Sequence, residues 1–193
     1  MVPAESPRTL PVSRPGFVDV GSVARQPVRP VAAPGLDEFL ERRSWLDLPP
    51  GPISVAAATV SAGGESEVVL EGEEFVLVLG GRLALRQGGV DIALEAGGQA
   101  LLVRGVPLSW SSDVGARLVV LRCTAGNGPA IGQPVKIDTS ATLSPSNPPL
   151  AELLVGPTPQ CRSHADYRSS SGEFVCGTWD STPYHRLPMR FQH

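Results

Sequence analysis

The chain has 193 residues, of which 41% are hydrophobic, so it is long enough for one packed domain and part of a second. A net charge of -3 without a lysine or arginine block excludes the basic surface that nucleic-acid backbones need, and we expect no nucleic-acid partner. No run of about 18 apolar residues and no signal pattern occur, so we also expect no membrane partner and a cytoplasmic location.

The three cysteines, Cys123, Cys161 and Cys176, lie on separate segments. An odd number of dispersed cysteines argues against a disulfide framework of the secreted kind, and we predict buried thiols. Cys161 and His164 could join Cys176 in a metal cluster, but without a paired motif the sequence favours satisfied core or surface residues.

The first 34 residues are rich in proline, which stops helices and strand ladders, and they predict an extended or disordered arm. The segment from Leu36 to Trp45 then places Leu36, Phe39 and Leu40 on one helical face, with acids early and arginines late. This pattern predicts one short helix, which the prolines at 49 and 50 end.

Residues 53 to 123 predict an all-β unit, because short β-branched or leucine-rich runs alternate with glycine-containing turns. Together with the preceding helix this unit is expected to form a first barrel domain, residues 35–125, of the jelly-roll type. The strands are expected at 53–60, 67–70, 75–79, 82–87, 90–94, 99–103, 108–111 and 117–123.

Two glycine- and acid-containing segments carry a family resemblance. Glu74 and Gly81 have an E-x6-G spacing after Ser61, and a second segment contains Gly97, Gly105 and Pro107. These segments resemble the two motifs of the cupin superfamily, in which histidines and a glutamate converge on one metal inside a small β-barrel. The resemblance implies a cupin jelly roll, also described as a double-stranded β-helix.

The positions that hold histidine in those motifs carry other residues here. Depending on the length of the spacer in the first motif, the first two histidine positions correspond to Val68 and Leu70 or to Glu67 and Val69. The third histidine position corresponds to Leu108. One carboxylate cannot hold a transition metal, so we predict a dry barrel with no metal ligands and no catalytic residues.

Two acidic residues and one tryptophan have alternative roles. A carboxylate in an apolar pocket could act as a general base, but for Glu73 and Glu74 we favour solvated turn carboxylates. Trp110 either lines a pocket or closes the barrel mouth as part of the core. If a pocket exists, its predicted lining is Val68, Leu70, Glu74, Leu108 and Trp110.

After a linker at 126–149, residues 150–193 predict strands at 150–155 and 173–180. The segment Gly177 to Pro183 echoes the start of the first cupin-like motif when Ser181 is aligned with Ser61. This echo resembles two-barrel cupins of the group that includes (S)-ureidoglycine aminohydrolase and the ethanolamine-utilisation cupins. It implies the opening of a second, incomplete barrel, and a manganese-like divalent metal would belong only to a completed one.

Three functions remain open at this point. The first is a metal-free structural barrel of such a bicupin, not catalytic by itself. The second is a non-enzymatic, sensory cupin that binds a small molecule in its apolar interior. The third is an interaction protein, a homodimer or a strand-pairing partner, because an incomplete sheet exposes backbone groups.

Overall fold

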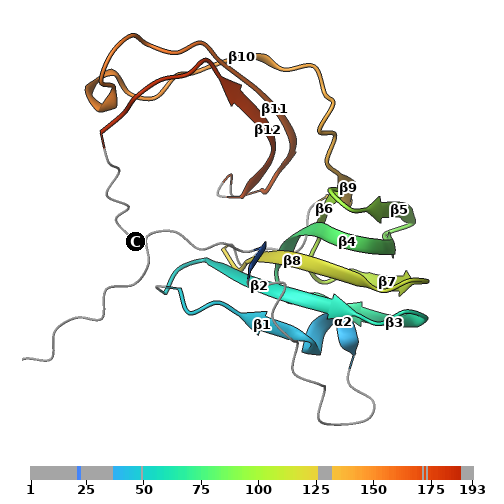
Figure 1. Ribbon diagram of the computed structural model, residues 1–193. Helices are drawn as coiled ribbons and strands as arrows, with labels where there is room; N and C mark the ends of the chain where they lie inside the picture. The colour runs from blue at the N-terminus through green and yellow to red at the C-terminus, as the bar shows by residue number, and fades with distance from the viewer. Residues whose placement is uncertain are drawn as a thin grey trace, which may run out of the picture.

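The structure is a computed structural model that describes residues 21–22, 37–48, 50–125, 132–170, 172 and 174–187. The predicted arm, residues 1–34, lies outside these ranges apart from residues 21 and 22, and so does Leu36. The described chain forms a β-barrel and a separate sheet that arches over one side of it (Figure 1). No helix in the described ranges has the length and apolarity to cross a membrane.

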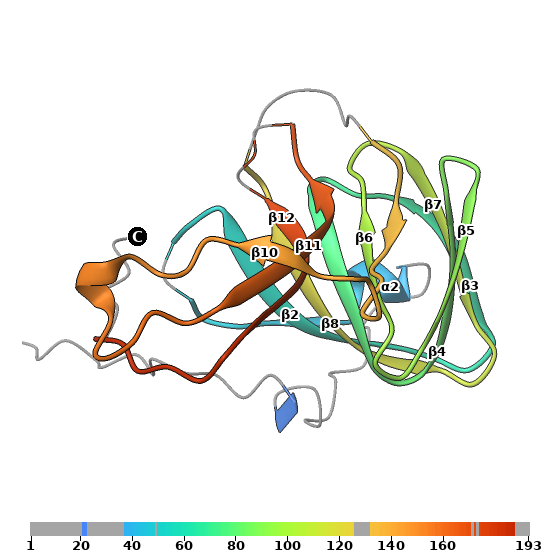
Figure 2. The ribbon, with the colours of Figure 1, turned by 90° about the horizontal axis from the view of Figure 1, so that it is seen from above.

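The barrel has two walls of antiparallel strands, seen side by side in Figure 2. The first wall runs in the order β1 (Arg43–Trp45), β2 (Ile53–Val60), β8 (Ala116–Cys123), β4 (Glu73–Gln87), β6 (Gln99–Leu102) and β9 (Val135–Lys136). The second wall runs in the order β3 (Gly64–Val69), β7 (Pro107–Ser112), β4 and β5 (Val90–Glu95). The predicted all-β jelly roll is confirmed.

The long strand β4 belongs to both walls, where two strands at 75–79 and 82–87 were predicted. Its first half pairs with β6 and β8, and its second half pairs with β5 and β7. The register shifts between Val78 and Gly80, and Gly81 has a φ of 83°. A Cβ at Gly81 would collide with the carbonyl oxygen of Gly115, so glycine is required at this bend.

The helix is shorter than predicted. Helix α2 covers only Glu38–Glu41, and the following residues Arg43–Trp45 form strand β1. Asp37 caps the helix by accepting the Leu40 N–H at 3.0 Å. The helical pattern was misleading because β1 pairs with residues 56 to 58 of β2, and this tertiary pairing overrides local propensity.

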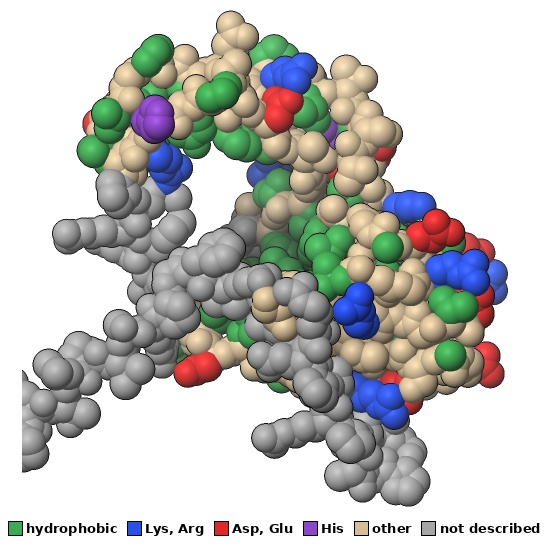
Figure 3. Space-filling model, in the orientation of Figure 1, with side chains coloured by type: hydrophobic (Ala, Val, Ile, Leu, Met, Phe, Trp, Pro, Cys, Tyr) green, Lys and Arg blue, Asp and Glu red, His purple; other side chains and the backbone are tan. Residues whose placement is uncertain are grey.

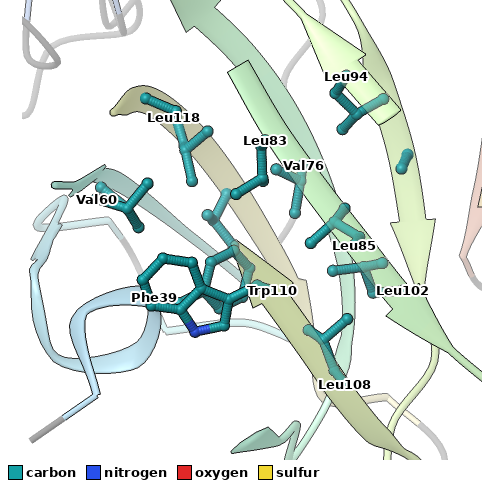
Figure 4. Packing of buried hydrophobic residues seen from close by; sticks show 14 of the residues in the cluster. Phe39, Val60, Val76, Leu83, Leu85, Leu94, Leu102, Leu108, Trp110 and Leu118 are labelled. Atoms are coloured by element: carbon teal, nitrogen blue, oxygen red, sulfur yellow. The ribbon is translucent and has the colours of Figure 1, made fainter. Parts of the chain in front are cut away.

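The barrel interior is filled by side chains from both walls and from α2. Figure 4 shows Phe39 and Trp110 against each other, with leucines and valines from the strands around them. Each fully buried side chain of this kind contributes about 1.5–3 kcal/mol. The almost fully buried phenylalanine and leucine side chains of this interior are Phe39, Leu70, Leu83, Leu94, Leu102, Leu108 and Leu118.

The second sheet has the order β10 (Ser144–Ser146), β11 (Cys161–Arg168) and β12 (Val175–Ser181). The predicted strand at 150–155 is wrong: Ala151–Leu153 form a 3-10 turn, and Leu154 makes an isolated bridge to Arg186. Two prolines precede this turn, and Leu150 is 64% exposed. Strand β11 was not predicted, because its sequence is largely polar.

A second, smaller apolar cluster joins this sheet to the outer face of the barrel. In Figure 3 hydrophobic side chains lie beneath the arch where it meets the barrel. The buried members of the cluster are Leu101, Cys123, Ile137, Tyr167, Phe174 and Cys176. All three cysteines are buried and none forms a disulfide, which confirms the prediction of buried thiols.

Candidate functional site

The ligand-equivalent positions lie inside the barrel. Val68 on β3 and Leu108 on β7 are register partners, with exposed fractions of 8% and 0%, and Leu70 is 1% exposed. In the other alignment, Glu67 is exposed and Val69 is 54% exposed. The inward-facing set is therefore Val68, Leu70 and Leu108, and all three belong to the packed core.

Glu74 also lies inside the barrel, so the expectation of a solvated turn carboxylate is wrong for it. Its side chain is 0% exposed, because it lies on the same face of β4 as the buried residues Val76 and Val78. A buried ionised carboxylate needs a charged or hydrogen-bonded partner. Two arginines supply that partner.

Arg43 binds Glu74 with both ends of its guanidinium. Nη1 donates to Oε1 at 2.7 Å and Nη2 donates to Oε2 at 2.9 Å, and the Arg43 side chain is 1% exposed. The remaining Nε donates to the carbonyl oxygen of Phe39 at 2.8 Å, and the guanidinium lies 5.0 Å from the centre of the Phe39 ring. The guanidinium is thus held by both β4 and α2.

Arg122 on β8 completes the cluster. Its Nε donates to Oε1 of Glu74 at 2.9 Å, and its guanidinium lies 4.9 Å from the ring centre of Trp45. Arg122 is 19% exposed and lies 3.8 Å from the surface carboxylate of Glu71. One interior acid is therefore neutralised by two guanidinium groups, one fully buried and one at the barrel rim.

These side chains do not fit a cupin metal. Three of the four ligand-equivalent positions are aliphatic and carry no donor atom, and both oxygens of Glu74 accept hydrogen bonds from arginine. Cationic groups beside the carboxylate also repel a divalent ion. Within the described ranges no three His, Cys, Asp or Glu side chains are arranged to hold a metal.

Residues from α2 and β7 close one end of the barrel. The Phe39 and Trp110 rings lie 6.2 Å apart at an interplanar angle of 31°, and Trp110 Nε1 donates to Asp37 Oδ2 at 3.0 Å. Asp37 therefore caps α2 and holds Trp110 at the same time. Trp110 is 3% exposed, and its position is that of a core residue.

Surface depressions run along the outer side of β3. One has a volume of about 560 Å³ and is bordered by Glu65, Glu67, Arg86 and Ser109, and an adjoining one reaches Asp37 and Glu38. Of the five residues predicted to line an interior pocket, only Trp110 borders these depressions. The other four, Val68, Leu70, Glu74 and Leu108, are buried.

Glu73 is buried as well, on the opposite face of β4, so the expectation of a solvated carboxylate is wrong here too. Its Oε1 accepts the hydroxyl of Tyr167 from the second sheet at 2.5 Å. Burial, and then this carboxylate, raise the pKa of Tyr167 well above its usual value of 10.0. Burial likewise raises the pKa of Cys176 to about 11, with Glu73 as the next cause.

Sequence reasoning missed Arg43, Arg122 and Tyr167. Arg43 was assigned to a helix end, where arginine is common. A usable signal was present in β8, where Arg122 follows four apolar residues and precedes Cys123. Charged residues are seldom buried without a partner, so an arginine in such a strand predicts an interior acid.

No protein-family model matches the chain, and no curated protein matches it. Several solved structures are similar to the chain. A protein of unknown function of the DUF861 family from Pseudomonas syringae pv. tomato is similar with a TM-score of 0.67 and 22% identity, over 82% of this chain and 70% of that chain. At this identity the likeness shows the fold alone.

Two further structures are similar over smaller parts of the chain. Ethanolamine utilization protein Q from Salmonella typhimurium has a TM-score of 0.36 at 17% identity, covering 39% of this chain and 61% of that chain. The cupin domain of Cnp3 from Schizosaccharomyces pombe has a TM-score of 0.39 at 15% identity, covering 42% and 63%.

Proposed function

We propose that this chain, an all-β protein with a cupin fold, uses its barrel as a metal-free scaffold for the second sheet. The observation that carries the proposal is the Arg43–Glu74–Arg122 cluster inside the barrel. Where a cupin metal would need the glutamate as a ligand, both of its oxygens already bind arginine.

The packing supports the same proposal. Val68, Leu70 and Leu108 are members of one apolar cluster that Phe39 and Trp110 complete at one end. An interior ligand would have to displace these side chains, so the alternative of a small-molecule cupin that binds inside the barrel has less support. In the bicupin interpretation the sheet β10–β12 is the opening of the second barrel, and the first barrel carries it through the Tyr167–Glu73 contact.

Metal analysis of the purified full chain tests the proposal. The protein is incubated with an excess of Mn²⁺, Ni²⁺ or Zn²⁺, desalted and measured for bound metal. We expect far less than one equivalent of each. Near-stoichiometric metal that Glu74→Gln removes, and that the matched surface variant Glu71→Gln retains, would overturn the proposal.

A further inference from the structure

Strand β12 lies at one edge of the second sheet. Among the described residues it pairs only with β11, and no strand covers its outer side. The direction of its backbone groups follows from two hydrogen bonds: Thr182 N–H donates to Gln160 O at 3.0 Å, and Ser169 N–H donates to Phe174 O at 2.8 Å. Because backbone groups alternate along a strand, even-numbered residues face β11.

The residues that face outward are therefore Val175, Gly177, Trp179 and Ser181. Val175 is 42% exposed, Trp179 is 51% exposed, and Gly177 is exposed as well. The outer edge of β12 thus presents unpaired N–H and C=O groups beside accessible apolar side chains. Such an edge is a template for another strand.

Natural sheets protect their edges with proline, lysine or very short strands. The opposite edge follows this rule, because β10 has only 3 residues and contains Pro145. Strand β12 has 7 residues without proline, lysine or arginine. Its one charged residue, Asp180, pairs with Arg162 of the same sheet through Nε at 3.1 Å and Nη2 at 2.5 Å.

We infer that β12 is a self-pairing edge, which joins two copies of this chain through an antiparallel β12–β12 contact. A two-fold axis at Thr178 places Gly177 beside Trp179 of the second copy and Val175 beside Ser181 of the second copy. The outward backbone groups of both copies then meet in hydrogen-bonded pairs.

The side chains suit this register. Gly177 cannot carry a side chain, because a Cβ there would collide with the His164 carbonyl oxygen. The Trp179 ring of the second copy lies over this bare backbone, an arrangement that stabilises strand glycines. Charge does not oppose the contact, since Asp180 is neutralised by Arg162 and faces Cys176 of the second copy.

Two variants test the inference in the full chain by sedimentation equilibrium across a range of concentrations. Trp179→Lys adds a charge at the edge, and Val175→Pro removes an outward N–H without removing a bond to β11. We expect a dimer for the unmodified protein and about tenfold or greater weakening of its dissociation constant in both variants. Leu150→Lys, at an apolar residue with 64% exposure outside β12, is the matched control and should remain dimeric.

Hydrogen exchange gives a second measurement that does not depend on variants. In the dimer the amides of Gly177 and Trp179 should be protected, and dilution to monomer should expose them while Thr178 and Asp180 stay protected. A monomer at all concentrations would overturn the inference, because the strand partner would then have to be a different protein. A dimer that Trp179→Lys leaves intact would overturn it too, because another face would hold the copies together. Neither result bears on metal binding in the barrel.

Discussion

The guanidinium of Arg43 holds both carboxylate oxygens of Glu74 inside the barrel, at 2.7 and 2.9 Å. The same guanidinium donates to the backbone of Phe39. The pair therefore connects the long strand shared by both walls to the helix that closes one end. The guanidinium of Arg43 therefore lies beside Glu74, the residue at the position of the metal-binding glutamate in cupins.

Replacing Arg43 with methionine should strongly destabilise the protein. Methionine keeps much of the side-chain volume but leaves Glu74 buried with Arg122 as its remaining partner. Breaking one side of a buried ion pair costs about 3–5 kcal/mol. Urea unfolding followed by tryptophan fluorescence measures this loss in the free energy of unfolding.

The double variant Arg43→Met/Glu74→Leu is the control for this change. Removing both charges should recover a large part of the lost stability, because an apolar pair of similar volume needs no counter-ion. If the single variant is as stable as the unmodified protein, the Arg43–Glu74 pair is not a buried contact of the barrel interior.

Val68 and Val69 provide a matched pair for the inward-facing ligand positions. Val68→Ala should reduce the free energy of unfolding by about 1–3 kcal/mol, because it leaves a gap beside Leu108. Val69→Ala should change it by less than about 0.5 kcal/mol, because Val69 is 54% exposed. Equal costs for the two variants would contradict the register of β3, and chemical denaturation measures both.

Tyr167→Phe should loosen the second sheet from the barrel. The change removes the hydroxyl that donates to Glu73 and leaves a buried carboxylate oxygen without this partner, which costs about 1–3 kcal/mol. Hydrogen exchange should become faster in β11 and β12 and stay unchanged in β2 and β8. Tyr184→Phe, in the same part of the chain, should leave both sets of amides as they are.

Stability should fall in alkaline solution. The pKa of Cys176 is raised from its usual 9.0 to about 11 in the folded chain, so the folded state holds the thiol proton more tightly than the unfolded state. This contribution is complete below pH 9 and is lost as the pH rises toward 11. Cys176→Ala should reduce the slope of the unfolding free energy over this interval, measured by urea titrations at several pH values. An unchanged slope in that variant would show that the thiol does not titrate differently on folding.

The sequence was sufficient for the jelly roll, because glycine turns and apolar runs are local signals that the barrel preserves. It was also sufficient to place Val68 or Val69 at the ligand positions, although only the pairing of β3 with β7 decides between them. The ends of the helix were not predictable from the pattern around Phe39, since β1 forms by pairing with β2.

The polar part of the interior was harder to predict than the apolar part. Glu74 and Arg43 are 31 residues apart, and the local sequence around either residue does not predict that the two form a pair. The same holds for Glu73 and Tyr167, which are 94 residues apart. Long-range ion pairs depend on tertiary geometry, whereas strand periodicity does not.

Glu73 and Glu74 are neighbours in sequence, yet one points into the barrel and the other toward the second sheet. A slip of β4 by one residue would bring Glu73 to Arg43 or Glu74 to Tyr167, depending on its direction, and would leave the other of these two residues without an acidic partner. The two adjacent acids therefore fix the alignment of β4 relative to both the barrel interior and the second sheet. Together the two contacts oppose a shift of β4 in either direction along the chain.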